Sequence, residues 1–143
     1  ENILKHFEKN ILYKQCFSQA RDINLVTSLQ TSDLTFVAKY HNMIIGLIQV
    51  VQTSITPFVH ECKKNSSIIV NFCIDKKFRS YGLGTNMLST VKHVCKHRNI
   101  PLYICINKKE PLNDEISLFR FYSRFGFQKV LESCDFILLE LKT

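Results

Sequence analysis

The stretch IIVNFCIDKKFRSYGLGTNM, residues 68–87, decides the fold. It begins with a run rich in Val, Ile and Phe, which is typical of a buried β-strand. Two of the chain's four glycines, Gly82 and Gly84, follow this run, with two lysines and Arg79 just ahead of them. From Met87 onward, apolar residues recur at helical spacing. The sequence therefore predicts a strand, a glycine loop and a helix, in that order.

The loop between the predicted strand and helix suits an anion. The first N–H groups of a helix have no partner inside it, and the positive end of the helix dipole adds to their attraction. Glycines let the backbone approach a phosphate without a Cβ in between, and Arg79 offers a charge-assisted contact. The alternative is a plain strand-to-helix turn, which needs one glycine and no arginine.

Two standard phosphate loops do not fit this spacing. GxxxxGK[ST] requires a lysine after its last glycine, but Gly84 is followed by Thr85. GxGxxG requires a third glycine at position 87, which is Met87. The anion site is therefore of another kind.

The rest of the chain predicts an α+β fold with a mixed sheet and helices on both faces. No repeat or linker interrupts it, so we expect a single domain over residues 1–143. The periodicities predict one or two helices in the first thirty-odd residues, a hairpin over 33–40 and 43–52 turning at Asn42, a strand over 102–107, a helix over 112–126 stopped by Gly126, and a closing strand pair over 127–133 and 135–142.

The composition is basic, with a formal net charge of +7 and a pI near 9.2. This balance attracts nucleic acids, acidic membranes or phosphorylated small molecules and leaves the anion unspecified. No nucleic-acid motif accompanies the charge, and no apolar run reaches the ~18 residues of a membrane span. We therefore expect an anionic small-molecule partner, with neither a membrane nor nucleic acid.

Six cysteines give an even count that is compatible with disulfides. Several lie inside apolar segments, where a reduced cysteine acts as a small core residue. The sequence thus favours a reduced, cytoplasmic protein. The segments HEC (60–62) and CKH (95–97) are the nearest approaches to metal pairs, and no second pair completes a four-ligand set, so no metal is expected.

Two motifs resemble one family. RSYGLG (79–84) resembles the R/Q-x-x-G-x-G/A signature of the GNAT superfamily of acetyl-CoA-dependent N-acyltransferases, and FYSRFGF (121–127) resembles its FYxxxGF segment. The resemblance covers roughly residues 33–130. It implies a GNAT-type, mostly antiparallel sheet with splayed central parallel strands, acetyl-CoA as cosubstrate, and a homodimer for which the closing strand pair is a plausible interface.

The resemblance also implies roles for individual residues. Backbone groups of Phe72, Cys73 and Ile74 would bind the pantetheine arm, and Tyr122 would donate a proton or hydrogen bond to the departing thiolate. Arg124 would reach the 3′-phosphate. A core aromatic and a solvated surface arginine are the alternatives for these two side chains. The pyrophosphate would lie against Arg79, Ser80, Tyr81, Gly82, Leu83, Gly84 and Thr85.

Two positions depart from the family or lack a clear match. Many members carry an asparagine about two helical turns before the tyrosine, where this chain has Glu115; Asn113 is the candidate substitute. No carboxylate is clearly placed as the base that deprotonates the amine. His60 and Glu61 are the candidates, and an exposed loop pair without a role is the alternative.

The acceptor amine stays open. FVHEC (58–62) faintly resembles a segment of glucosamine-6-phosphate N-acetyltransferases, and the positive charge suits an amino-sugar phosphate. Those enzymes usually carry Glu-Asp where this chain has Val70 and Asn71. A peptide, protein or other small amine is the second possibility, and a non-catalytic acyl-CoA-binding module is the third.

Overall fold

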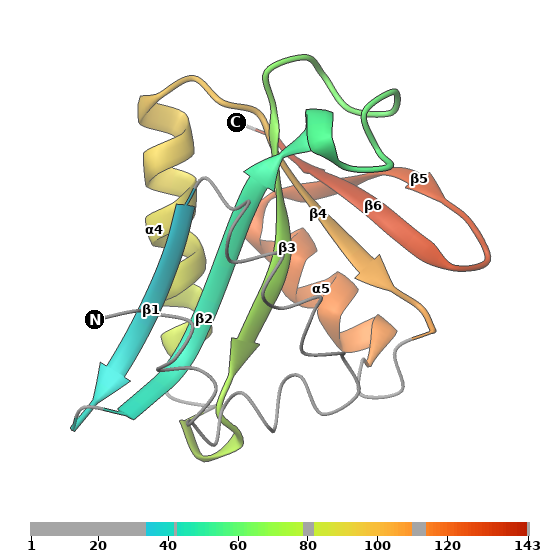
Figure 1. Ribbon diagram of the computed structural model, residues 1–143. Helices are drawn as coiled ribbons and strands as arrows, with labels where there is room; N and C mark the ends of the chain where they lie inside the picture. Colours follow the sequence, from blue (N-terminus) through green and yellow to red (C-terminus); the bar gives the residue numbers. More distant parts are fainter. Residues whose placement is uncertain (1–33, 42, 79–81, 110–113, 143) are drawn as a thin grey trace. The chain divides into compact units, whose positions relative to one another are not determined.

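The computed structural model describes residues 34–41, 43–78, 82–109 and 114–142. Within them, six strands form one sheet in the order β1-β2-β3-β4-β6-β5 (Figure 1). None of the described helices is long and apolar enough to cross a membrane. The elements are β1 (Leu34–Tyr40), β2 (Met43–Gln52), η1 (Thr53–Ile55), β3 (Ser67–Ile74), η2 (Lys76–Phe78), α4 (Leu83–His97), β4 (Leu102–Asn107), α5 (Glu115–Phe125), β5 (Phe127–Glu132) and β6 (Phe136–Leu141).

The predicted fold class is confirmed, because the sheet is mixed and is accompanied by helices. The helices expected near the N-terminus lie outside the described residues. The chain divides into two compact units, one drawn from residues 1–51 and 70–94 and the other from 52–69 and 95–143. Strand β3 contributes to both. The expectation of one domain stays a prediction.

The hairpin of the first unit forms as the sequence predicts. Strands β1 and β2 pair antiparallel from Leu34↔Val50 to Tyr40↔Met43. Positive φ falls on His41 within the described turn, and Asn42 lies outside the described residues. Gly46 of β2 allows close packing, because a Cβ built there would lie 2.7 Å from the Sδ atom of Met87 on α4. This face of β2 therefore packs on α4.

The second unit holds the parallel pair that the family resemblance implies. Strand β3 pairs with β4 from Ser67↔Leu102 to Ile69↔Ile104, and β6 pairs antiparallel with both β4 and β5. The interior of this unit is mostly apolar, as the Ile- and Leu-rich strands predict, and includes the buried side chains of Tyr103, Ile106, Phe127, Leu138 and Leu139.

Helix α5 is bounded by local sequence signals at both ends. The side chain of Asp114 accepts a hydrogen bond from the backbone N–H of Ser117, at 3.2 Å, and another from its hydroxyl, at 2.8 Å. These bonds lower the pKa of Asp114. Gly126 ends the helix in the left-handed conformation, with φ of 115°. The predicted glycine stop is therefore confirmed.

Among the described residues, the cysteines differ from expectation at one position. Cys62, Cys95, Cys105 and Cys134 are free thiols, whereas Cys73 is disulfide-bonded. The expectation of a fully reduced chain is therefore wrong at Cys73. The apolar segment around it suggested a sealed core position, but the residue is only half-buried near the end of β3.

Candidate functional site

The start of α4 has the geometry of an anion site. Gly82 has a backbone φ of +77°, which residues with a side chain rarely adopt. A Cβ built on it would meet no heavy atom within 4 Å. The first helical hydrogen bond runs from the N–H of Asn86 to the carbonyl of Gly82, at 3.0 Å. The N–H groups of residues 83–85 thus come before the i→i−4 ladder. Since the first turn also has no acidic residue, this end fits a phosphate.

The end of β3 belongs to the same unit as this helix start. Phe72, Cys73 and Ile74 are all half-buried in the last part of the strand. Just beyond them, the N–H of Asp75 donates a 2.8 Å hydrogen bond to the carbonyl of Ile45 on β2. The strand end and the glycine turn are thus parts of one compact unit, which is consistent with the roles predicted for them.

Four of the predicted site residues lie outside the described residues: Arg79, Ser80, Tyr81 and Asn113. Their assigned contacts with the pyrophosphate and the pantetheine stay predictions. Of the pyrophosphate loop, the described residues are Gly82, Leu83, Gly84 and Thr85.

Tyr122 is buried on α5, with 5% of its surface exposed. Its ring makes edge contacts with Phe121, at a centroid distance of 5.4 Å, and with Phe127, at 5.8 Å. Burial raises the pKa of the phenol, so it stays protonated near neutral pH. Its hydroxyl makes no hydrogen bond to a described residue. The side chain therefore fits the core, and its protonated hydroxyl can donate a hydrogen bond.

The other α5 residues singled out by the sequence lie near the helix surface. Glu115, which replaces the family's usual asparagine, forms a 3.7 Å ion pair with Lys108. Its carboxylate therefore contributes to the charge balance of the second unit. Arg124 is exposed in the last turn, which is compatible with both a phosphate contact and a solvated arginine.

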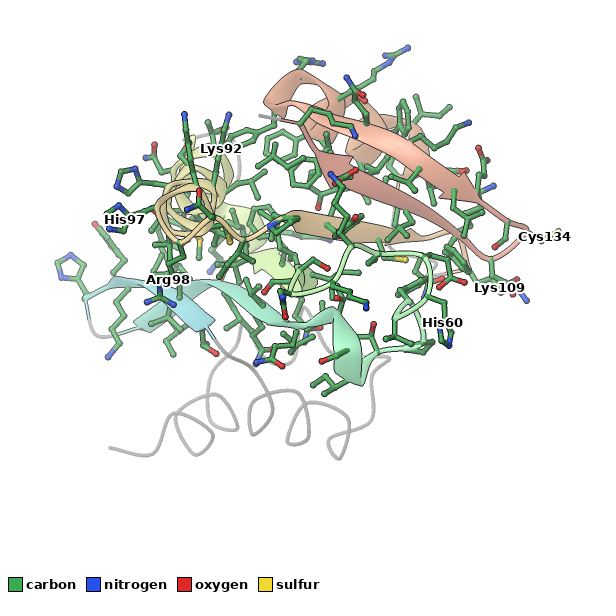
Figure 2. The ribbon with its side chains drawn as sticks, turned by 90° about the horizontal axis from the view of Figure 1, so that it is seen from above. His60, Lys92, His97, Arg98, Lys109 and Cys134 are labelled. Carbon is green, nitrogen blue, oxygen red and sulfur yellow. The ribbon has the colours of Figure 1, made fainter. Side chains whose placement is uncertain are left out.

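His60 and Glu61 lie in the exposed loop between η1 and β3. Figure 2 shows His60 at the edge of the second unit, on the same side as Lys109 and Cys134. The loop is held locally, because the N–H of Glu61 donates to the carbonyl of Phe58 at 3.1 Å. Both candidate bases are therefore accessible to solvent.

The neighbouring thiol is not a competing nucleophile. Cys62 is buried directly after the two candidate bases. The pKa of this thiol is raised to about 11, mainly because the thiol is buried and further because of the negative charges of Glu61 and Glu140. A thiol with this pKa is almost entirely protonated near pH 7, whereas a cysteine nucleophile reacts as the thiolate.

One polar pair was missed by the sequence reasoning. The Nδ2 of Asn71 on β3 donates a 2.6 Å hydrogen bond to the Oε1 of Gln49 on β2. Gln49 is completely buried, and its Nε2 has no hydrogen-bond partner among the residues that the structure describes. The signal in the sequence was a single amide inside the apolar run MIIGLIQVV (43–51). A buried amide in such a run calls for a partner across the sheet.

The comparison with protein families matches residues 1–136 to the acetyltransferase (GNAT) domain. The chain belongs to the GNAT acetyltransferase family. This membership makes it an acetyl-CoA-dependent acetyltransferase and confirms the family that the glycine loop and FYSRFGF predicted. No curated protein sequence matches the chain. The faint resemblance to glucosamine-6-phosphate N-acetyltransferases gains no support from these comparisons.

Several solved structures share this fold. PH1933 from Pyrococcus horikoshii OT3 has a TM-score of 0.76 at 19% identity, covering 98% of this chain and 90% of that one. A GNAT family acetyltransferase from Elizabethkingia anophelis with acetyl-CoA bound has a TM-score of 0.69 at 18% identity, with coverages of 94% and 92%. Arabidopsis thaliana Naa50, in complex with the bisubstrate analogue CoA-Ac-MVNAL, has a TM-score of 0.64 at 16% identity, with coverages of 92% and 90%. These likenesses show the fold.

Proposed function

We propose that this GNAT protein acetylates the primary amine of an anionic small molecule, with an amino-sugar phosphate such as glucosamine 6-phosphate as the candidate. The observation that carries the acetyl-CoA half is the start of α4, where Gly82 leaves space and the N–H groups of residues 83–85 are free of the helical ladder. The net charge of +7 supports an anionic acceptor.

In this proposal the cosubstrate lies along the first unit's strand end and glycine turn. Residues 79–85 bind the pyrophosphate, and the backbone of residues 72–74 binds the pantetheine as an added strand would. Asn113 takes the place of the family's asparagine, and Arg124 contacts the 3′-phosphate.

The reaction is a direct attack. The lone pair of the neutral amine forms a bond to the thioester carbonyl carbon, and the carbon–sulfur bond then breaks. A base, His60 or Glu61, accepts the amine's proton, and Tyr122 gives its proton to the departing sulfur. The phenol of Tyr122 is protonated near neutral pH, so its hydroxyl can donate a hydrogen bond to the sulfur as the carbon–sulfur bond breaks. The high pKa of Cys62 favours direct attack over transfer through that thiol.

A peptide amine is the second candidate acceptor. The likeness to Naa50 favours it, because that protein's complex contains an analogue joining CoA to the peptide sequence MVNAL. The basic surface of this chain would then select acidic over basic peptides.

We also propose a homodimer through the closing strand pair. Strand β5 is an edge strand of the sheet. It exposes Val130 and Leu131, by 45% and 37% of their surfaces. Exposed apolar residues on an edge strand favour pairing with a second copy. A monomeric mass in light scattering would contradict this.

The acceptor proposal is tested by following thiol release from acetyl-CoA with a panel of amines. The panel contains glucosamine 6-phosphate, glucosamine, a peptide with a free N-terminus and an N-terminally blocked lysine peptide. Release with glucosamine 6-phosphate and little with glucosamine supports an anionic amino sugar. Release only with a peptide would replace the amino sugar by a peptide amine as the proposed acceptor. Calorimetry that shows CoA binding, together with no release on any amine, would indicate a binding module and overturn the enzymatic proposal.

A further inference from the structure

The side chain of Gln49 is buried although it is polar. It is completely buried on β2, and its Nε2 has no hydrogen-bond partner in the described part of the chain. Burying an unpaired donor costs free energy, which a leucine or methionine of similar size would avoid. Its Oε1, however, accepts the 2.6 Å hydrogen bond from Asn71. The gain from a glutamine at this position is therefore its hold on Asn71.

The position of the pair follows from strand alternation. Gly46 faces Met87 of α4, so even-numbered residues of this part of β2 point to that helix. Gln49 is odd-numbered and lies on the other face of the sheet, and its bond to Asn71 places the asparagine side chain there too. Both residues belong to the first unit. Asn71 comes immediately before the residues proposed to bind the pantetheine.

The hydrogen bond to Gln49 also determines which side-chain atom of Asn71 is available to a substrate. Its Nδ2 is directed to Gln49, and Asn71 itself is only half-buried. The Oδ1 atom, which accepts hydrogen bonds and donates none, makes none to a described residue. An amide oxygen is too weakly basic to remove an amine's proton, but it can hold an N–H while the nitrogen lone pair stays free to attack.

We propose that Asn71 binds the acceptor amine through Oδ1 and that Gln49 is the positioning residue that orients it. This inference rests on the proposed acetyl transfer and deepens it. Asn71 receives one N–H of the uncharged amine beside the strand that binds the pantetheine. Gln49 does not touch the substrate. With its Oε1 facing Asn71, it keeps the Nδ2 of Asn71 from turning toward the amine, where two donors would oppose each other.

The experiment compares variants of the full chain, with glucosamine 6-phosphate and the free N-terminal peptide as probe acceptors. Gln49→Met keeps the volume and removes the oxygen that holds Asn71. We expect its KM for the acceptor to rise about tenfold or more, with KM for acetyl-CoA unchanged. Asn71→Leu should do the same, and Gln49→Glu, which keeps an oxygen facing Asn71, should recover much of the loss. Gln52→Met, which removes an exposed glutamine at the end of the same strand, should change neither KM.

A further variant adds a readout that packing alone would not move. In Asn71→Asp the carboxylate repels the Oε1 of Gln49, so the glutamine amide turns and donates its Nε2 instead. The pH profile of the acetylation rate should then show one additional ionisation, that of the introduced carboxylate, which is absent from the profile of the wild type.

Unchanged KM values for both substrates in folded Gln49→Met and Asn71→Leu proteins would overturn the inference and leave a structural amide pair. Equal rises in both KM values would do so as well. If Gln49→Met does not fold, Asn71→Leu decides alone. A wild type that binds CoA but acetylates neither probe overturns the proposed function instead, a result visible before any variant is made.

Discussion

The hydroxyl of Tyr103 donates a 3.3 Å hydrogen bond to Oε2 of Glu140 and thereby joins β4 to β6 inside the second unit. The same hydroxyl accepts the backbone N–H of Lys63, at 3.0 Å. The Nζ atoms of Lys63 and Lys142 each lie 2.9 Å from the carboxylate. Glu140 is 5% exposed, so these contacts replace the water that its carboxylate loses on burial. Because they hold a carboxylate in its charged form, they determine how acid acts on this unit.

The first prediction concerns Glu140 and pH. Burial opposes its ionisation, but the hydrogen bonds from Lys63 and Lys142 outweigh this and hold its pKa below the ordinary 4.5. A lowered folded-state pKa stabilises the protein above the unfolded pKa, and that stabilisation is lost as pH falls through the folded value. The free energy of unfolding in urea should therefore drop below about pH 4.5, and drop less in Glu140→Gln.

A matched control is Glu132→Gln. Glu132 also pairs with lysines, Lys108 and Lys129, but its side chain is 38% exposed. Exposed pairs contribute about 0–1 kcal/mol, whereas removing the charge of Glu140 should cost about 1–3 kcal/mol at neutral pH. If both variants lose stability equally, the buried network has no special role.

The second prediction separates two buried tyrosines. Tyr122→Phe should lower kcat by about 100-fold, the scale of general acid catalysis, and leave CoA affinity and stability nearly unchanged. The reason is that its hydroxyl makes no hydrogen bond within the described residues. Tyr103→Phe should lower stability by about 1 kcal/mol and leave kcat unchanged. Steady-state kinetics and urea unfolding measure both, and full activity in Tyr122→Phe would exclude it as the acid.

The third prediction separates two glycines with positive φ. Gly82→Ala should weaken CoA binding at least about tenfold, since the turn before α4 must approach the phosphates, and strain there costs about 1–2 kcal/mol. Gly126→Ala should cost stability, because its φ is 115° and the new Cβ would lie 3.3 Å from Cδ1 of Leu141. CoA affinity should not change in that variant. Calorimetry with CoA makes the comparison; equal affinities in the two variants would contradict the phosphate role of the turn.

Local chemistry explains what the sequence could predict. Strand β4 matches the predicted 102–107, and Gly126 stops α5, because Pro101 and a left-handed glycine are signals that need no distant partner. The glycine loop was recognisable for the same reason, since its residues are contiguous.

Partners far apart in sequence were not predictable. Glu140 in FILLELK reads as an ordinary polar position, and its burial depends on Tyr103, 37 residues away. The Gln49–Asn71 bond spans 22 residues and requires the register of β2 against β3. The disulfide at Cys73 was missed because an apolar neighbourhood in sequence does not give the exposure of a strand end.

The last prediction tests the packing of Gly46 against Met87, the contact that shows which face of β2 lies against α4. A Cβ at Gly46 would lie 2.7 Å from Sδ of Met87, at the flexible end of that side chain. Because that end can shift, Gly46→Ala should cost only about 1 kcal/mol, the low end of the range for overpacking, and Met87→Ala about 2–5 kcal/mol through the cavity it leaves. The double variant should cost at least about 0.5 kcal/mol less than their sum, because each change relieves the other. Leu88→Ala removes a fully buried side chain of α4 that is not among the nearest neighbours of that Cβ, so with Gly46→Ala it should be additive. Urea unfolding of the five variants measures both cycles, and additivity in the Met87 cycle would mean that β2 and α4 do not pack through this pair.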